Sequence, residues 1–296
     1  MIDGAKDKLV APRLVSGLSE IVGDYDLILC DVWGVLHNGL AAFPAAGAAL
    51  QRARAGGARV LLVSNAPRPN VFVAAMLDGF GVPRDAYDGI VTSGDVTRDV
   101  LAARPGVRLF HLGPERDLGT FDGLDVVPTS LEEAELVVCT GLLNDDVETP
   151  KDYAGRLAAM KARNLLFVCA NPDLVVERGD TLVYCAGALA QSYQEMGGEA
   201  IYCGKPHKPI YDVALRHAAA FGGAPVRAER VLAIGDALRT DIIGATAAGF
   251  DSLFISSGIH AEELHGENGS EPDAEALANL FSDHAHPRGV MPRLAW

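Results

Sequence analysis

The sequence is short of positive charge. Its 296 residues include 25 Lys and Arg against 39 Asp and Glu, which leaves a formal net charge of −14 at pH 7. Nucleic acids and anionic membranes bind proteins through an excess of cations, so neither is expected as a partner of this chain. An anionic small molecule can still bind, provided that a metal ion or a few fixed cations reverse the field locally.

Paired cysteines and long apolar runs are also absent. The five cysteines are odd in number and contain no Cys-x-x-Cys spacing, and several lie in apolar segments such as the one ending at Cys30. This pattern favours buried reduced thiols over a disulfide framework or a zinc site. No run approaches the ~20 apolar residues that cross a bilayer. No basic segment followed by a long apolar run opens the chain, so a cytoplasmic protein is expected.

The glycine motifs of several large enzyme classes are missing. The chain has no Gly-x-Gly-x-x-Gly and no Gly-x-Ser-x-Gly, which argues against a dinucleotide-binding enzyme or a serine hydrolase. Gly204 and Lys205 suggest a Walker A loop. However, Gly198 lies one position too far upstream, and Pro206 stands where that loop needs Ser or Thr.

Short apolar runs alternate with alanine-rich segments along most of the chain. Strands are predicted at 27–30, 59–63, 231–234 and 252–255, and helices at 44–57, 71–80 and 242–248. Strands that are apolar along almost their whole length are typical of a parallel sheet covered by helices on both faces. The predicted fold class is therefore α/β, with a doubly wound, Rossmann-like parallel sheet.

The middle of the chain carries a strand–helix alternation of its own. Strands are predicted at 107–111, 136–140 and 165–169, and helices at 96–103, 153–162 and 186–196. Acidic loops set this part apart as a solvated unit inserted into the first domain. We therefore expect a core domain of residues 1–93 and 199–296 with an inserted α/β domain of residues 94–198. The polar tail from His265 onward predicts no function.

Three predicted strands of the core end in polar residues: Asp31, Ser64 with Asn65, and Asp236. In open α/β sheets ligands bind at the carboxyl ends of the strands. Any one of these residues alone can simply cap a helix. Asp31 and Asp236 lie far apart in the sequence, so the fold must bring them together. Two carboxylates with few other donors suit a hard cation such as Mg²⁺.

Four ordered motifs resemble those of the haloacid dehalogenase (HAD) superfamily of aspartyl-phosphate phosphohydrolases. They are Asp-Val-Trp-Gly-Val-Leu at 31–36, Val-Ser-Asn at 63–65, Gly-Lys-Pro at 204–206 and Gly-Asp-Ala-Leu-Arg-Thr-Asp at 235–241. The last two, with the long insertion before them, are similar to the class IIA branch. That branch contains sugar-phosphate, nucleotide and p-nitrophenyl phosphatases with an α/β cap domain between the second and third motifs. The resemblance thus implies that residues 94–198 form such a cap.

The resemblance also assigns roles to matching residues. It implies that Asp31 is the nucleophile that forms an aspartyl phosphate and that Ser64 hydrogen-bonds a phosphoryl oxygen. It also implies that Lys205 neutralises charge on the nucleophile and on the phosphate. Asp31, Asp236 and the main-chain carbonyl of Trp33 would hold Mg²⁺, with Asp241 supporting a metal-bound water. Taken as single residues, Lys205 can equally be a solvated loop lysine, and Asp241 can be the N-cap of the helix predicted at 242–248.

The first motif departs from the family pattern at Trp33. Phosphatases of the family carry a second Asp there, which gives a proton to the leaving oxygen and later takes one from water. An indole is an N–H donor without a useful pKa, and proton transfer of this kind is worth ~10²–10⁴-fold in rate. One explanation is that His37 supplies the proton, although it can also be an ordinary loop histidine. The other is that the substrate has a good leaving group, as an aryl or acyl phosphate does. Trp33 is expected to pack against a ligand or the cap.

Substrate recognition is expected from the cap and from the second motif. Asn171 and Asp173 follow the strand predicted at 165–169, in a loop that class IIA members aim at the active site, although an Asx-turn explains them as well. Asn65 is the third candidate for binding substrate. Arg68 either contacts the substrate phosphate or belongs to the junction with the cap.

The sequence therefore predicts a Mg²⁺-dependent phosphohydrolase that acts through Asp31 on a small, sugar-phosphate-like metabolite. The main alternative is a weak or silent phospho-ligand-binding protein that kept the fold and the metal pocket but lost turnover at Trp33. A third hypothesis is a phosphotransferase whose aspartyl phosphate is long-lived because no base activates water. A homodimer is compatible with each of the three.

Overall fold

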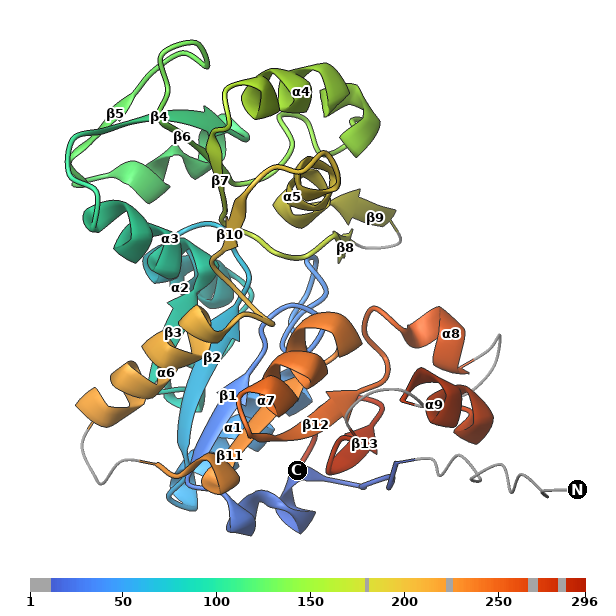
Figure 1. The fold of residues 1–296 in the computed structure, drawn as a ribbon. Helices are drawn as coiled ribbons and strands as arrows, with labels where there is room; N and C mark the ends of the chain where they lie inside the picture. The colour runs from blue at the N-terminus through green and yellow to red at the C-terminus, as the bar shows by residue number, and fades with distance from the viewer. Residues whose placement is uncertain (1–11, 179–180, 222–225, 266–270, 282–285) are drawn as a thin grey trace, which may run out of the picture.

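The computed structural model describes residues 12–178, 181–221, 226–265, 271–281 and 286–296. The chain forms two units, each built on its own sheet, stacked one above the other in Figure 1. The chain leaves the first unit after α3 (Ser93–Ala102) and returns to it between β10 (Ala200–Tyr202) and α6 (Lys208–Ala220). All five cysteines are free and buried, as the sequence predicts.

The first unit, called the core below, is built on a six-stranded sheet in the order β13-β12-β11-β1-β2-β3, with every neighbouring pair parallel. The strands are β1 (Leu27–Cys30), β2 (Arg59–Ser64), β3 (Gly89–Thr92), β11 (Val231–Gly235), β12 (Asp251–Ile255) and β13 (Gly289–Met291). The first-motif strand β1 lies in the middle, between β11 and β2. The ends of β1 and β11, which Asp31 and Asp236 follow, therefore lie next to each other.

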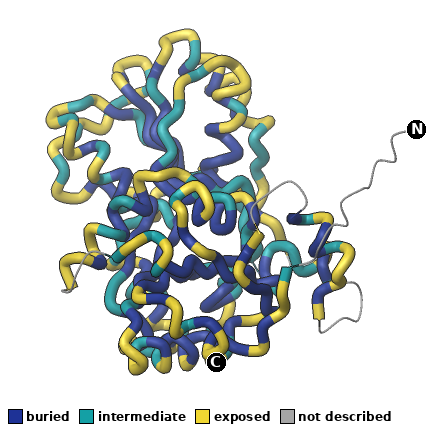
Figure 2. The backbone as a smooth tube through the Cα atoms, turned by 60° about the horizontal axis from the view of Figure 1, so that its bottom comes forward, coloured by how far each residue is buried: buried dark blue, intermediate teal, exposed yellow. Residues whose placement is uncertain are grey.

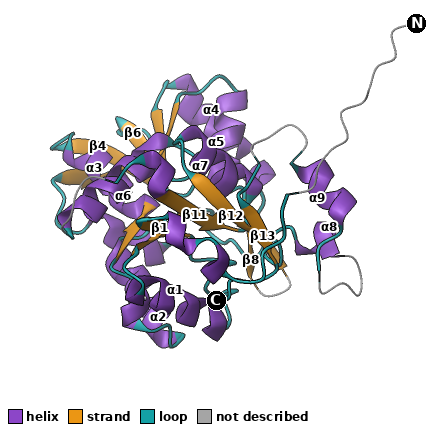
Figure 3. Cartoon of the chain, turned by 90° about the horizontal axis from the view of Figure 1, so that it is seen from below, coloured by secondary structure: helices purple, strands orange, loops and turns teal. Residues whose placement is uncertain are grey.

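Helices cover both faces of this sheet, which confirms the doubly wound α/β class (Figure 3). Alternate side chains of β1 point to opposite faces. Ile28 packs with α1 (Pro44–Ala55) and α2 (Asn70–Gly79) in one apolar cluster, while Leu29 packs with α6 and α7 (Ile243–Ala247) in another. Two further helices, α8 (Ala261–His265) and α9 (Ala274–Leu280), flank the β12–β13 edge.

The second unit, called the cap below, contains a five-stranded parallel sheet in the order β10-β7-β6-β4-β5. Its other strands are β4 (Val107–Leu112), β5 (Val126–Pro128), β6 (Leu136–Cys139) and β7 (Leu166–Cys169), and its helices are α4 (Ala154–Ala162) and α5 (Ala186–Glu195). A separate antiparallel hairpin, β8 (Val175–Arg178) with β9 (Thr181–Tyr184), extends from it toward the core.

The expected boundary at residue 198 needs correction. Because β10 pairs with β7 in register, residues 200–202 belong to the cap sheet, and the return to the core comes only with the Gly204-Lys205 motif. The other boundary, at 93/94, falls at the start of α3, which packs against β3 and α6 of the core. The sequence analysis counted this helix in the cap, as part of the strand–helix alternation of residues 94–198.

The two units share buried apolar contacts. One cluster joins Leu61 and Val63 of the core with Leu109, Leu136 and Val168 of the cap. Figure 2 shows buried backbone through the middle of both units, with exposed stretches along the outer helices and loops. None of the helices in the described part of the chain has the length and apolar character that crossing a bilayer requires.

Candidate active site

Three carboxylates meet at the carboxyl edge of the core sheet. Asp31 follows β1 directly, Asp236 follows β11, and Asp241 lies in the π-helical turn Leu238–Ile242. Each offers an oxygen within 4.8 Å of the others. Since β1 and β11 are neighbouring parallel strands, the fold brings Asp31 and Asp236 together as the sequence predicts.

Lys205 lies within this group of carboxylates. Its Nζ donates to Asp31 Oδ1 at 2.6 Å and to Asp241 Oδ1 at 2.7 Å, and the residue is 4% exposed. The interpretation of Lys205 as a solvated loop lysine is therefore wrong. Asp241 also accepts from the main-chain N–H of Ala237 at 3.1 Å, upstream of it, and no side chain caps the helix that starts at Ile243. Its interpretation as the N-cap of that helix is wrong as well.

The site carries more negative charge than its own lysine can balance. With all groups ionised, the three carboxylates and one ammonium leave two negative charges in excess. Burial raises the pKa of Asp31 to about 7 despite the adjacent Lys205. Burial and the charges of Asp31 and Asp241 raise the pKa of Asp236 well above its usual range. Burial by itself would lower the pKa of Lys205, but Asp241 and Asp31 together raise it.

Glycines allow the backbone to approach these carboxylates closely. Gly34, at a φ of +79°, and Gly258 both lie against the Asp236 carboxylate, and Gly235 lies against Asp241. A Cβ at any of the three would overlap the carboxylate, so a side chain there would displace it. Asp236 Oδ2 is fixed further by the main-chain N–H of Ile259 at 2.8 Å.

Asn65 organises the Lys205 loop. Its Oδ1 accepts from the main-chain N–H of Lys205 at 2.7 Å, and its Nδ2 donates to the Lys205 carbonyl at 3.1 Å and to Asp173 Oδ1 at 2.9 Å. The amide thus bonds groups within the protein, and its role in binding substrate stays a prediction. Ser64 precedes it at the end of β2, and its Oγ accepts from the Ala66 N–H at 3.2 Å.

The loop after β7 connects the cap to this site. Asn171 Oδ1 accepts from the Asp173 N–H at 3.1 Å, which is the Asx-turn considered from the sequence. Asp173 in turn bonds Asn65 of the core. Burial raises the pKa of Asp173 to about 6, although Lys205 and Asn65 act in the opposite direction. Both loop residues line the cleft described below.

Trp33 reaches from the first motif to the cap. Its Nε1 donates to the main-chain carbonyl of Glu177 in β8 at 2.6 Å. The contact agrees with the expectation that Trp33 packs against the cap. His37 lies behind the indole with no exposed surface, its ring 4.9 Å from that of Trp33, and its Nδ1 accepts from the Gly39 N–H at 2.9 Å. Burial lowers the pKa of His37 to about 4, so the ring is neutral at pH 7 and a poor substitute for the missing acid.

A cleft of about 1,020 Å³ lies between core and cap over these residues. Besides the predicted residues, it is lined by cap groups that sequence reasoning missed. Arg116 and Arg178 both pair with Asp145, and Arg178 bonds Asp146 at 2.8 Å. Arg68 of the core lies 3.5 Å from Asp117 of the cap, in keeping with a place at the junction.

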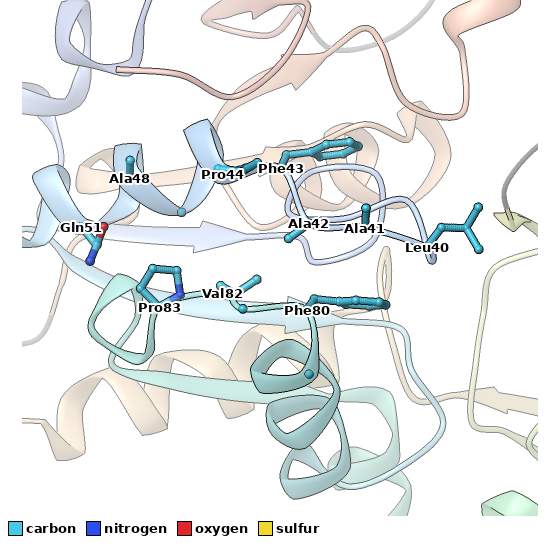
Figure 4. Close-up of a pocket in the computed structure, with 13 residues that line it drawn as sticks. Leu40, Ala41, Ala42, Phe43, Pro44, Ala48, Gln51, Phe80, Val82 and Pro83 are labelled. Atoms are coloured by element: carbon cyan, nitrogen blue, oxygen red, sulfur yellow. The ribbon is translucent and has the colours of Figure 1, made fainter.

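A second hollow of about 420 Å³ lies on the core, away from the carboxylates. Figure 4 shows it between residues 40–51 on one side and 80–83 on the other, with the rings of Phe43 and Phe80 at one end. Among the described residues that line it, none is titratable. The cleft between core and cap, in contrast, is lined by titratable side chains, among them Asp31, Asp236 and Lys205.

Comparison with known proteins shows which family the chain resembles. A family model described as haloacid dehalogenase-like hydrolase matches residues 28–126, and one described as HAD-hydrolase-like matches residues 202–282. A solved haloacid dehalogenase-like hydrolase from Brucella suis 1330 is 48% identical, with a TM-score of 0.85, and covers 95% of this chain and 100% of its own. The ribonucleotide monophosphatase NagD of Escherichia coli K12 is 26% identical over 244 residues, 78% of this chain and 88% of NagD. A glycerol phosphate phosphatase from Mycobacterium tuberculosis, solved in complex with magnesium, is 26% identical with a TM-score of 0.64, over 86% of this chain and 77% of its own.

Proposed function

Because the chain belongs to the haloacid dehalogenase-like hydrolase family, in its class IIA capped branch, we propose that it is a Mg²⁺-dependent phosphohydrolase. The proposed reaction uses Asp31 as nucleophile on a small phosphorylated metabolite. Relatives are named as phosphatases of ribonucleotides and of glycerol phosphate, which supports phosphate esters as the substrate class. The observation that carries the proposal is the buried group of Asp31, Asp236 and Asp241 around Lys205.

The residues present fit a magnesium ion. The donors are carboxylate oxygens, which hard cations prefer, and the two excess negative charges match a divalent ion. Asp31, Asp236 and the main-chain carbonyl of Trp33 would hold it, with Asp241 beside them. When bound, Mg²⁺ would draw negative charge from the phosphoryl group and keep the Asp31 carboxylate ionised. The fit rests on donor type and charge, and the magnesium complex of one relative supports it.

Asp31 is the reacting group in this proposal, and Lys205 positions it. Lys205 holds one oxygen of the Asp31 carboxylate, and the other oxygen would act as the nucleophile. Attack by that oxygen forms an O–P bond while the P–O bond to the leaving group breaks, and water then hydrolyses the aspartyl phosphate to phosphate and free Asp31. Ser64 would donate a hydrogen bond to a phosphoryl oxygen. Such catalysis depends mostly on positioning and charge stabilisation.

The leaving group must depart without an acid from position 33. The indole N–H is already donated to the Glu177 carbonyl, and His37 is buried and neutral. We therefore propose that aryl and acyl phosphates are hydrolysed faster than alkyl phosphates. The same observation favours the second candidate function, a weak or silent phospho-ligand-binding protein. Asn171 and Asp173 would contact the remainder of the substrate from the cap loop, and the five buried thiols support a cytoplasmic location.

Turnover of p-nitrophenyl phosphate and acetyl phosphate with Mg²⁺ tests the proposal. Wild-type protein should hydrolyse both, and Asp31→Asn should lose the activity. Activity of Asp31→Asn equal to that of wild type would rule out Asp31 as the nucleophile. If wild type is inactive while Trp33→Asp hydrolyses both substrates, the protein is the silent binder. The experiment is repeated with acetyl phosphate that carries a radiolabelled phosphoryl group. Label that stays on the wild-type protein after an acid quench, without release of phosphate, would indicate the phosphotransferase.

A further inference from the structure

We propose that Trp33 is a positioning residue that fastens the β8–β9 hairpin of the cap onto the core on the side of the cleft opposite to the chain connections. Position 33, where the family carries its proton-transfer group, would here control closure of the cap. The conformational inference stands on the Trp33–Glu177 contact itself, and its catalytic consequence rests on the function proposed above.

The position of the Trp33–Glu177 bond in the fold allows it to hold the cap closed. Both connections between the units, through α3 and between β10 and α6, run along one side of the molecule, while the β8–β9 hairpin lies on the other side (Figure 1). Near the connections, Thr120 donates to the Pro67 carbonyl at 3.0 Å. A bond beside the connections constrains rotation of the cap weakly. A bond on the far side, such as Trp33 to Glu177, must break when the cleft opens.

The indole is held firmly from the core side. Its six-membered ring lies so close to Gly39, at a φ of +85°, that a Cβ there would overlap it, and His37 contacts it edge-on. The indole N–H is a donor without acceptor capacity, and its partner is a main-chain carbonyl. The ring therefore presents one fixed donor to one fixed acceptor across the cleft.

The hairpin is bonded to the rest of the cap, so the two should move together. Arg178, at the end of β8, bonds Asp145 at 2.9 Å and Asp146 at 2.8 Å in the cap body. Leu182 and Tyr184 of β9 line the same cleft and are partly exposed. Fastening Glu177 to Trp33 consequently fixes the wall that faces the leaving group of a substrate bound at Asp31.

Distance measurements between spin labels test the closure. Ala159→Cys in α4 and Ala274→Cys in α9 place labels at exposed positions of cap and core, and the five native cysteines are buried. A hydrogen bond of ordinary strength changes an equilibrium by roughly two- to tenfold. Trp33→Phe, which keeps an aromatic ring but lacks the N–H, should lower the closed-to-open ratio by that factor. A distance distribution identical to that of wild type would overturn the proposal.

Glu177→Ala is the matched control, because the acceptor is the main-chain carbonyl and survives the substitution. It should leave the distance distribution unchanged. Opening as large as that of Trp33→Phe would show that the Glu177 side chain, and not the indole bond, holds the cap, and would contradict the proposal. Thermal melting checks that both variants are folded.

A second measurement keeps Trp33 in place. The chain has two tryptophans, so in Trp296→Phe the fluorescence reports Trp33 alone. Its quenching by acrylamide should be several-fold weaker than that of free indole, and quenching as strong as that of free indole would mean that the cap does not cover it. If wild type hydrolyses p-nitrophenyl phosphate, Trp33→Phe should raise KM more than it lowers kcat. If wild type is inactive, the function proposed above fails while the distance and quenching measurements still decide the closure.

Discussion

At the scale of single residues, the site depends on one buried cation among several buried acids. Lys205 is the described cation that contacts two of the three carboxylates, and removing it would leave them unpaired in a poorly solvated place. Removal of one partner from a buried ion pair is far more costly than loss of a surface pair, because the remaining charge keeps its desolvation penalty. Lys205 therefore matters to folding as well as to chemistry.

Lys205→Met should lower the free energy of unfolding by about 3–5 kcal/mol in metal-free protein. Urea denaturation in EDTA at pH 7 measures this change. Lys208→Met is the matched control, because Lys208 is exposed and pairs only with its helical neighbour Asp212 among the described residues. The control should barely change the midpoint. Equal effects of the two substitutions would mean that the pairing of Lys205 contributes no stability.

The acids of the site should also make the stability of the metal-free protein depend on pH. A carboxyl whose pKa is higher in the folded state binds its proton more tightly when folded, so its stabilising contribution is lost as pH rises through the folded value. For Asp31 the window runs from about 4 to about 7. In EDTA, the melting temperature of wild type should therefore fall relative to that of Asp31→Asn as pH rises through this window. Saturating Mg²⁺ should remove the difference in slope, and parallel pH profiles in EDTA would contradict the prediction.

Sequence reasoning predicted that Asp31 and Asp236 come together, but it did not predict how the residues around them interact. Asp31 and Asp236 could be predicted because each directly follows an apolar strand, and the carboxyl ends of parallel strands share one edge. The role of Asn65 could not be predicted, because its partner Lys205 is 140 positions away and nothing in the sequence indicates that a backbone will bind that amide. The Trp33–Glu177 bond could not be predicted either, because its acceptor is a main-chain carbonyl of the cap, 144 positions away from the indole.

At the scale of elements, long apolar strands were predictable and short mixed ones were not. β1 matches its predicted bounds, because four consecutive apolar residues are typical of a strand that is buried on both faces. The β8–β9 hairpin was missed, because its strands are four residues each and only partly buried. A signal was nevertheless present, since the Gly179-Asp180 pair between them is typical of two-residue hairpin loops. β10 has three residues and is recognisable only by its pairing with β7.

Helix α3 is the element that connects the core to the cap, and its N-terminus is fixed by Asp95. Thr92 and Asp95 form a capping box, with bonds of 3.0 Å and 2.9 Å. Asp95 also accepts from the Asn70 N–H at 3.1 Å, so one carboxylate caps α3 and holds the first turn of α2. Loss of this side chain should therefore loosen two helices at the junction.

Asp95→Ala should lower the free energy of unfolding by about 1–3 kcal/mol, more than the typical ~1 kcal/mol of a single lost cap. Asp99→Ala is the control on the same helix, because the Asp99 side chain is exposed and, among the described residues, its ion pair is with Arg216 at 3.4 Å. Chemical denaturation of the two variants gives the comparison. A loss for Asp95→Ala no larger than that for Asp99→Ala would show that the capping box does not stabilise the junction.

At the scale of the whole molecule, the shared apolar cluster should make core and cap one cooperative unit. Leu136 of β6 is 2% exposed and belongs to the same cluster as Leu61 of β2. An inserted unit of this size can fold on its own, but a continuous buried cluster across the junction couples its unfolding to that of the core. The two sheets should therefore unfold in one transition.

Leu136→Ala tests this coupling. Truncation of a buried leucine costs about 2–5 kcal/mol, and the cost should appear in both units although the substitution lies in the cap. Hydrogen exchange followed by mass spectrometry in increasing urea reports peptides from β6 and from β11 separately. Both peptides should lose protection at the same urea concentration, and that midpoint should fall equally in the variant. If the β11 peptide kept its wild-type midpoint while β6 lost protection early, the cap would be an independent folding unit, and the shared cluster would be too weak to couple the two sheets.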